Sequence, residues 1–366
     1  MSSRIKDIAN YLEGIAPRSM QESYDNSGLL VGNPNVAVSG ILVSLDCTPE
    51  VVNEAISKGC NLIVSHHPVI FKGLKKITGA TYSERTIIEA IRHGVALYAI
   101  HTNLDNFDGG VNHEIGLRLG LFNLKVLRPK ADVLNKLTVF VPSDHADRLV
   151  SAMYAAGAGK IGNYEECSFS VEGTGTYKPV GQAEPFQGVL NERSTVSELR
   201  VEFLVSSHRL SGVIHAMKDN HPYEEVAYDI IPLRNLNQNE GSGMIGELGV
   251  DITEAEFLTL LKKTFNSGCI RHTSILGRNV RKVAFCGGAG SFLLSDAIAA
   301  GADFFVTGDF KYHEFFDAEH KIVIADIGHY ESEQFTVNQL AGFLKKNFTT
   351  FAVHLTETNT NPINYF

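Results

Sequence analysis

A repeated alternation of short apolar runs and amphipathic stretches limits what this 366-residue chain can fold into. The run at 38–48, rich in Val, Ile and Leu, is typical of a parallel strand that is buried on both faces. Helix signals follow at once, because Thr48 can cap a helix and Pro49 suits its first turn. The alternation continues to about residue 120 and recurs over 280–356. It predicts an α/β fold, with two βαβ-rich halves forming a mixed, mostly parallel sheet domain to which each half contributes a half-sheet.

The middle of the chain has a different pattern. Strands with alternating polarity are expected at 134–142, 166–177, 195–206 and 224–233, and helices at 144–157 and 208–220. This order predicts an inserted ferredoxin-like α+β domain at about 130–236. The α/β domain is then divided, with its N-terminal half at 1–129 and its C-terminal half at 237–366.

Charge and cysteine usage exclude several classes of protein. The chain has 41 acidic and 32 basic residues, a formal net charge of −9, which argues against nucleic acid and anionic lipid as partners. No apolar run reaches the roughly 20 residues that cross a bilayer, and no signal-peptide core is recognisable. The five cysteines are too dispersed for a local disulfide framework or a Cys-x-x-Cys zinc site. We therefore expect a cytoplasmic protein that binds no membrane.

Histidines and carboxylates gather where three of the predicted strands end. In open α/β sheets, ligands bind beyond the carboxyl ends of the strands, so side chains at these positions should converge. Imidazole with carboxylate is the ligand chemistry of zinc, iron and manganese sites. The residues concerned are His66, His67, His101, Asp105, His329 and Glu333.

The spacing of these residues favours two metal ions over one. Adjacent histidines that leave a strand, His66 and His67, point to different sides, so two neighbouring ions could take one each. Ions about 3.5–4 Å apart also need a bridging carboxylate, for which Asp105 is the natural candidate. His329 and Glu333 are four residues apart at a helix start and can face the same way. The alternative is structural: a His-His-Pro turn, and a His329 that only hydrogen-bonds the helix start.

Two other strand ends carry weaker signals. The turn 286–291, CGGAGS, could offer backbone N–H groups to a phosphate, but Leu293 stands where a dinucleotide-binding motif needs its third glycine, and a plain tight turn explains it as well. Asp309 and His313 follow another strand and could support the metal ligands or shuttle a proton. A helix cap by Asp309 is an equal alternative.

Five separated motifs give the chain a family resemblance. They are YDNSGLLVG (24–32), SHHPVIFKG (65–73), HTNLDNFDGGVN (101–112), TGDFKYHE (307–314) and GHYESE (328–333). In this order they resemble the GTP cyclohydrolase I type 2 homologues, also called Nif-three-like proteins. The resemblance places the family's dinuclear metal ligands at His66, His67, Asp105, His329 and Glu333. One departure is Tyr24, where many members carry Trp; it leaves the ligands untouched but could alter a pocket wall.

The inserted stretch is similar to a second known domain. Residues 159–169 and 221–230 resemble the CutA-like or PII-like domain of the longer bacterial members. Those members form toroidal hexamers whose metal sites face an internal cavity. The resemblance therefore implies a homo-oligomer, expected to be a hexamer.

The resemblance also implies an activity. It points to a metal-dependent hydrolase with metal-activated water, two divalent ions per chain and a small-molecule substrate that could be a nucleotide such as GTP. Zinc is the first expectation for the metal, with iron or manganese as alternatives, and His101 or His313 are the candidates for proton transfer. Two alternatives stay open: a non-enzymatic metal-binding or regulatory module, and a metallohydrolase of another substrate, such as a phosphoester or a cyclic amide.

Overall fold

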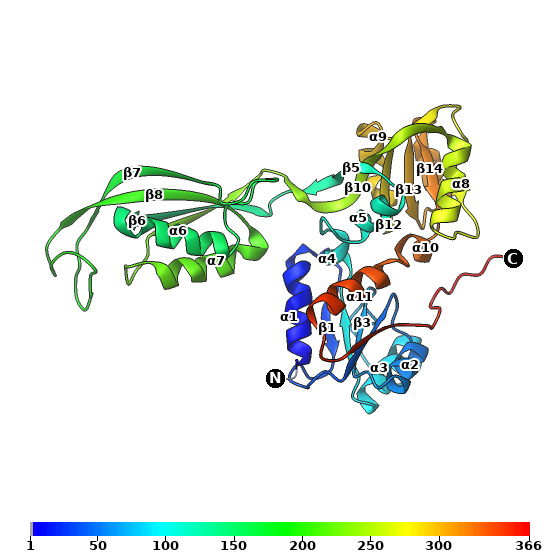
Figure 1. Cartoon of the computed structure of the whole chain (residues 1–366), viewed down its shortest axis with the longest axis horizontal. Helices are drawn as coiled ribbons and strands as arrows, with labels where there is room; N and C mark the ends of the chain where they lie inside the picture. The colour runs from blue at the N-terminus through cyan, green and yellow to red at the C-terminus, as the bar shows by residue number, and fades with distance from the viewer. Residues whose placement is uncertain (1–2) are drawn as a thin grey trace. The chain divides into compact units, whose positions relative to one another are not determined.

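A computed structural model describes residues 3–366 of the chain (Figure 1). The chain divides into two compact units. The main unit runs through Pro129 and resumes at Asn239, and the inserted unit is Lys130–Gln238. Within residues 3–366, no helix is long and apolar enough to span a lipid bilayer.

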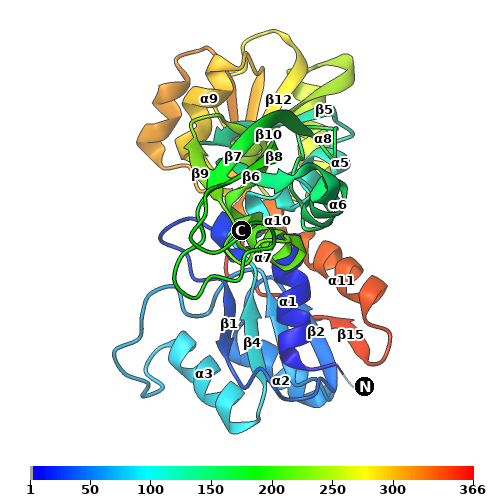
Figure 2. The ribbon, with the colours of Figure 1, turned by 90° about the vertical axis from the view of Figure 1, so that its left-hand side faces the viewer.

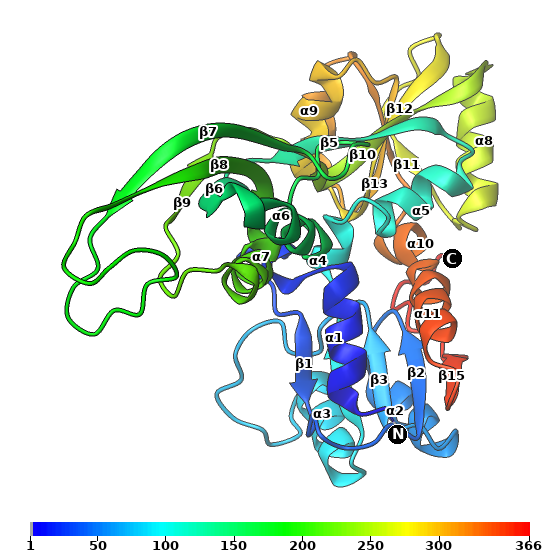
Figure 3. The same ribbon diagram turned by 60° about the vertical axis from the view of Figure 1, so that its left-hand side comes forward.

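The first sheet of the main unit has five strands in the order β1-β4-β3-β2-β15. Neighbouring strands are parallel except for β1 and β4. Helices α2 and α3 cover one face and α1 and α11 the other (Figure 3). The bounds are β1 Gly28–Val31, β2 Gly40–Ser44, β3 Leu62–Ser65, β4 Ala96–Ala99, β15 Ala352–Leu355, α1 Ile5–Ile15, α2 Pro49–Ser57, α3 Tyr82–Arg92 and α11 Thr336–Asn347.

Local signals account for these elements as the sequence predicts. The Thr48 hydroxyl accepts a hydrogen bond from the Val51 N–H and Pro49 occupies the first turn of α2. Every residue of β2, β3 and β4 is buried, in keeping with continuous apolar runs that are covered on both faces.

The second sheet of the main unit has six strands in the order β11-β14-β13-β12-β10-β5. Strands β12, β13 and β14 are parallel, whereas β10 runs antiparallel to β12 and β11 antiparallel to β14. Helices α8 and α5 pack on one face, and α9 and the 3-10 helix η4 on the other (Figure 2). The bounds are β5 Phe122–Lys130, β10 Asn237–Thr253, β11 Arg271–His272, β12 Asn279–Ala289, β13 Phe304–Gly308, β14 Val323–Asp326, α5 Val111–Arg118, α8 Glu254–Thr264, α9 Leu294–Ala299 and η4 Tyr312–Ala318.

The two halves of the main unit exchange strands, which the sequence does not predict. Strand β15, near the C-terminus, pairs in parallel with β2 of the first sheet, and β5, which comes before the inserted unit, joins the second sheet. A single buried cluster also includes Ile8 of α1, Val64 of β3 and Phe285 of β12. The two sheets therefore share one core.

The inserted unit alternates strands and helices in the order β6, α6, β7, β8, α7, β9 (Figure 1). Its sheet has the order β7-β8-β6-β9 with antiparallel neighbours. A core that includes Leu137, Phe203, Leu149 and Met217 joins one face of the sheet to both helices. The bounds are β6 Leu134–Pro142, α6 Ala146–Ala155, β7 Ser168–Tyr177, β8 Ser194–Ser206, α7 Ser207–Asn220 and β9 Tyr228–Leu233.

Candidate metal centre

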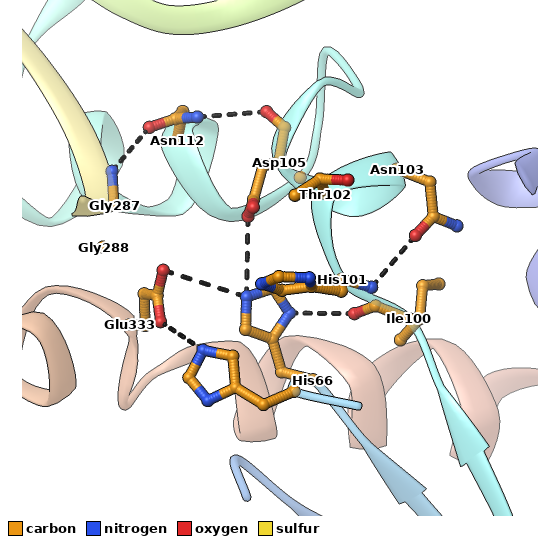
Figure 4. A network of polar contacts seen from close by, with 12 residues as sticks. His66, Ile100, His101, Thr102, Asn103, Asp105, Asn112, Gly287, Gly288 and Glu333 are labelled. Carbon is orange, nitrogen blue, oxygen red and sulfur yellow. Dashed lines mark hydrogen bonds and ion pairs between the residues drawn. The ribbon is translucent and has the colours of Figure 1, made fainter. Parts of the chain in front are cut away.

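Three strand ends of the main unit deliver imidazole and carboxylate groups to one place. His66 and His67 directly follow β3, and β4 leads through His101 into the short helix α4, Thr102–Asp105. After β14, Gly328 precedes α10, His329–Glu333, whose first and last side chains are four residues apart. Figure 4 shows Asp105, His101 and Glu333 around His66.

The Glu333 carboxylate lies between two groups of potential ligands. Its Oε2 is 3.0 Å from His67 Nε2 and 3.1 Å from His329 Nε2. Its Oε1 faces His66 Nε2 at 3.9 Å, and Asp105 Oδ1 lies 3.5 Å from that same His66 atom (Figure 4). Two triads could therefore each hold a metal ion, and both include Glu333. One consists of His67, His329 and Glu333, and the other of His66, Asp105 and Glu333.

This arrangement differs from the expectation that Asp105 would bridge. Asp105 belongs to one triad only, whereas Glu333 belongs to both. The reason lies in the placement of α10, which packs against β12 and β13 and brings the buried Glu333 side chain, at its last position, within reach of both His66 and His67. Sequence spacing alone does not reveal that placement.

His101 lies beside both adjacent histidines. Its ring centroid is 5.3 Å from that of His66 and 5.3 Å from that of His67, and the three imidazoles form a further group that could hold a metal ion. His313, by contrast, lies in η4 with its ring stacked on Phe316 at 6.4 Å. Among residues 3–366, His313 belongs neither to these groups nor to the cavity lining described below.

Each of the four clustered histidines has its Nδ1 held by an oxygen. His66 Nδ1 is 2.8 Å from the Ile100 carbonyl oxygen, and the other three Nδ1 atoms meet carboxylates. These pairs are His67–Asp46 at 2.7 Å, His101–Asp25 at 2.8 Å and His329–Asp309 at 2.7 Å. Such partners fix the ring and leave Nε2 for a metal ion, as metal-binding histidines require.

The sequence analysis does not predict two of these carboxylates, Asp46 and Asp25, as partners of the histidines. Asp46 follows β2 at a strand end, so the rule that selected His66 also applies to it. Asp25 lies in the YDNSGLLVG motif, and it also accepts hydrogen bonds from the backbone N–H and the hydroxyl of Thr102. Asp309 was expected as either a partner of the ligands or a helix cap, and its carboxylate contacts His329.

Unpaired buried atoms indicate that the cluster suits a cation. His66 Nε2 and Asp105 Oδ1 are buried and have no hydrogen-bond partner among residues 3–366; the two atoms lie 3.5 Å from each other. Buried polar atoms are nearly always paired, because an unpaired one costs about 1–3 kcal/mol. Both atoms belong to the triad of His66, Asp105 and Glu333, so the donor chemistry fits a divalent metal ion at that position.

The electrostatics of the cluster point the same way. The negative charge of Glu333 raises the pKa of His329 to about 11. Burial lowers the pKa of His67, but its hydrogen bonds to Asp46 and Glu333 outweigh burial and raise it to about 10. Burial and then the charge of Glu333 raise the pKa of Asp105 to about 7. The cluster thus attracts positive charge, which protons supply when no metal ion is bound.

A cavity of about 680 Å³ opens onto the cluster. Aromatic side chains form much of its wall, and Tyr24 stacks on Phe71 with ring centroids 6.5 Å apart. Glu22, Asp46, Asp105, Asp309 and Glu333 also line it. No lysine or arginine is found in this lining among residues 3–366.

The glycines near the end of β12 allow a close approach to Glu333. Gly288 has φ +61°, and a Cβ there would lie 2.4 Å from Glu333 Oε1. The Gly288 N–H donates to Ser332 Oγ at 2.9 Å, and the Gly287 N–H donates to Asn112 Oδ1 at 3.0 Å. The N–H groups of Gly287 and Gly288 are therefore not free to bind a phosphate. Residues 286–289 belong to β12, whose register shifts between Phe285 and Ala289, so this stretch is an irregular strand end and not the tight turn expected as the alternative.

Fold and site together define an α/β protein whose two sheets bring a histidine–carboxylate cluster to one cavity. The model of the Duf34/NIF3 (NGG1p interacting factor 3) family matches residues 3–362, and the chain belongs to this family. The GTP cyclohydrolase 1 type 2 homolog of Staphylococcus epidermidis is 36% identical over 366 residues, 99% of this chain and 100% of the relative. That of Halalkalibacterium halodurans is 41% identical over 324 residues, 88% and 87% of the two chains.

Solved structures agree with this assignment. A Bacillus cereus protein related to NIF3 has a TM-score of 0.88 and 37% identity and covers both chains completely. Staphylococcus aureus protein SA1388 has a TM-score of 0.77 and 31% identity, covering 100% of this chain and 99% of its own.

Proposed function

We propose that the protein is a metal-dependent hydrolase with a dinuclear centre. The observation that supports it is the sharing of Glu333 by two triads of potential ligands. His67, His329 and Glu333 would hold one divalent ion, and His66, Asp105 and Glu333 the other. Zinc is our first choice, because it accepts this mixture of imidazole and carboxylate, and iron and manganese are alternatives. When bound, such ions supply Lewis-acid activation of water for hydrolysis.

The surrounding residues prepare the site for this chemistry. Ile100, Asp46 and Asp309 orient the ligand imidazoles through their Nδ1 atoms. His101 is the residue that we assign to proton transfer, because it lines the cavity beside the ligands and its Nδ1 is held by Asp25. His313 does not line the cavity and has no part in this proposal.

The cavity lining favours an uncharged ring as the substrate over a nucleoside triphosphate. The names of the relatives suggest GTP, whose guanine could stack on Tyr24 or Phe71. A triphosphate, however, would meet the carboxylates of Glu22, Asp46 and Asp309 beyond the metal ligands and no lysine or arginine of residues 3–366, so the metal ions alone would have to balance its charge. The N–H groups of Gly287 and Gly288 are already bonded. A cyclic amide avoids this conflict and is the second candidate substrate.

Metal-reconstituted protein tests both substrates. Protein loaded separately with zinc, manganese or iron is incubated with GTP, with formate release as the readout, and with a panel of cyclic amides. We expect ring opening of a cyclic amide that collapses in Asp105→Ala. Formate release from GTP would instead support the activity that the relatives' name suggests. Absence of turnover with every metal would favour a non-enzymatic metal-binding or regulatory module.

We also propose that the chain assembles as a homohexamer in the cytoplasm. Residues 130–236 would form a CutA-like or PII-like domain, and residues 1–129 and 237–366 the two halves of the metal-binding domain. The support is the sequence resemblance of 159–169 and 221–230, together with the strand and helix order of the inserted unit. Light scattering on the full-length protein tests the assembly. A mass of six chains is expected, and a monomer would contradict it.

A further inference from the structure

The chain after β15, residues 356–366, reaches the metal-centre cavity through residues 361–363. It forms neither helix nor strand and appears as the red C-terminal trace in Figure 1. Asn361, Pro362 and Ile363 line the cavity together with His67 and Glu333. This C-terminal strap, defined as residues 356–366, is therefore part of the wall around the candidate ligands.

The strap is anchored at its beginning and near its end. The hydroxyls of Thr356 and Thr358 each donate to Glu54 Oε2 at 2.6 Å, and the Glu357 N–H donates to Glu54 Oε1 at 2.8 Å. The ring of Tyr365 lies against Gly268, where a Cβ would come within 2.7 Å of it.

Between the anchors, Thr360 connects the strap to a candidate metal ligand. Its hydroxyl donates to Asp46 Oδ2 at 2.6 Å, while Asp46 Oδ1 lies 2.7 Å from His67 Nδ1. His67 Nε2 is in turn 3.0 Å from the shared Glu333 carboxylate. The neighbouring Asn361 donates to Glu331 Oε1 at 3.2 Å, on the helix that carries His329 and Glu333.

We propose that Thr360 is a positioning residue of the metal centre, which acts through Asp46 on His67. A carboxylate that holds an imidazole by one oxygen can still rotate, and a hydrogen bond to its other oxygen fixes its plane. With Asp46 fixed, His67 keeps Nε2 directed at the triad that it forms with His329 and Glu333. Partners of metal-ligating histidines contribute about 10–100-fold to metal affinity. Thr360 is separated from His67 by one more hydrogen bond than Asp46 is, so we expect loss of its hydroxyl to weaken metal binding by about tenfold, the lower end of this range. This inference rests on the proposed metal centre.

The strap itself offers a matched control. Thr358 carries the same hydroxyl, also at 2.6 Å from a carboxylate, but its partner Glu54 hydrogen-bonds none of the clustered histidines. Metal-free, full-length wild type, Thr360→Val, Thr360→Ser and Thr358→Val are titrated with Co²⁺, whose d–d absorption reports both occupancy and coordination geometry. Circular dichroism confirms that each variant is folded.

We expect Thr360→Val to weaken one of two Co²⁺ sites by about tenfold and to change its absorption bands. Thr360→Ser, which keeps the hydroxyl, should resemble the wild type, and Thr358→Val should bind Co²⁺ normally. Wild-type affinity in Thr360→Val would overturn the inference. So would equal weakening in Thr358→Val, or weakening in a folded Thr360→Ser, because the Thr360 hydroxyl would then not be the cause. A wild type that binds no Co²⁺ would instead overturn the metal centre itself, and this inference with it.

Discussion

His67 and Glu333 are 266 positions apart in the sequence, yet Nε2 of His67 lies 3.0 Å from Oε2 of Glu333. The other oxygen of Glu333 faces His66. One carboxylate therefore faces both adjacent histidines, which solves the difficulty that neighbouring residues after a strand point to different sides. The geometry makes Glu333 the residue on which both triads depend.

Replacing the shared carboxylate should affect both ions. Glu333→Gln keeps the shape of the side chain but removes its negative charge, so both triads lose a ligand. We expect the bound zinc, measured by elemental analysis after dialysis, to fall from two ions per chain to nearly none. Asp105→Asn is the matched control, because it removes a ligand from one triad and should leave about one ion. Two retained ions in Glu333→Gln would contradict the shared role.

Metal binding should release protons and strengthen as the pH rises. Without metal, the pKa of His67 is raised to about 10 and that of His329 to about 11. Their Nε2 atoms lie 3.3 Å apart, and charge repulsion at this distance favours one proton shared by the pair over two. A metal ion needs neutral imidazole, so its binding at pH 8 should displace at least one proton. Titration calorimetry in two buffers of different ionisation enthalpy gives the number of protons released, because each released proton adds the ionisation heat of the buffer. A binding heat independent of the buffer would show that these histidines titrate near their usual pKa.

Position 288, near the end of β12, should tolerate no side chain. Gly288→Ala combines a positive φ of +61° with a Cβ only 2.4 Å from Glu333 Oε1, so Glu333 must move. We expect a loss of zinc affinity of at least about tenfold, as for loss of an outer partner of a ligand. Gly59→Ala is the control that distinguishes backbone strain from the steric clash, since Gly59 has a φ of +69° but nothing lies within 4 Å of the added Cβ. Equal zinc affinity in both variants would contradict the steric argument.

Much of the site follows from the sequence because strand ends are local features. The apolar runs before His66, His101 and His329 end where the structure ends β3, β4 and β14, give or take a residue. Parallel strands bring such ends to a common edge of each sheet, which makes convergence predictable. The strands and helices of the inserted unit can likewise be predicted, because they follow one another in a continuous stretch of the sequence.

What the sequence does not reveal depends on contacts between distant segments. Strand β10, Asn237–Thr253, is polar and glycine-rich, so no apolar run announces it. The exchange of β5 and β15 between the sheets depends on pairing partners, which local patterns do not specify. The same applies to the bridge: whether Asp105 or Glu333 lies between the triads depends on where α10 packs. The strand-end rule could have included Asp46, but that Asp46 and Asp25 hold the Nδ1 atoms of His67 and His101 is known only from the structure.

Glu54 should stabilise the fold by tying the C-terminal strap to α2. Its side chain is 11% exposed and accepts hydrogen bonds from Thr356, Thr358 and Lys58. Burial opposes ionisation, but these bonds outweigh it and lower the pKa of Glu54 from 4.5 to about 2. Because the pKa is lower in the folded state, the contribution is complete above pH 4.5 and is lost as the pH falls towards 2. It amounts to at most about 3 kcal/mol.

Glu54→Gln should therefore lower the free energy of unfolding at pH 7 by about 1–3 kcal/mol, measured by urea denaturation. The difference from the wild type should shrink as the pH is lowered from 5 to 3, since below pH 4.5 the unfolded wild type binds a proton at Glu54 while the folded carboxylate, with its pKa near 2, still resists protonation. Glu89→Gln is the control, because Glu89 pairs with Arg92, whose side chain is 68% exposed, and such surface pairs contribute about 0–1 kcal/mol. A Glu54→Gln variant as stable as Glu89→Gln at pH 7, or a difference that does not change with pH, would show that the Glu54 carboxylate does not hold the strap.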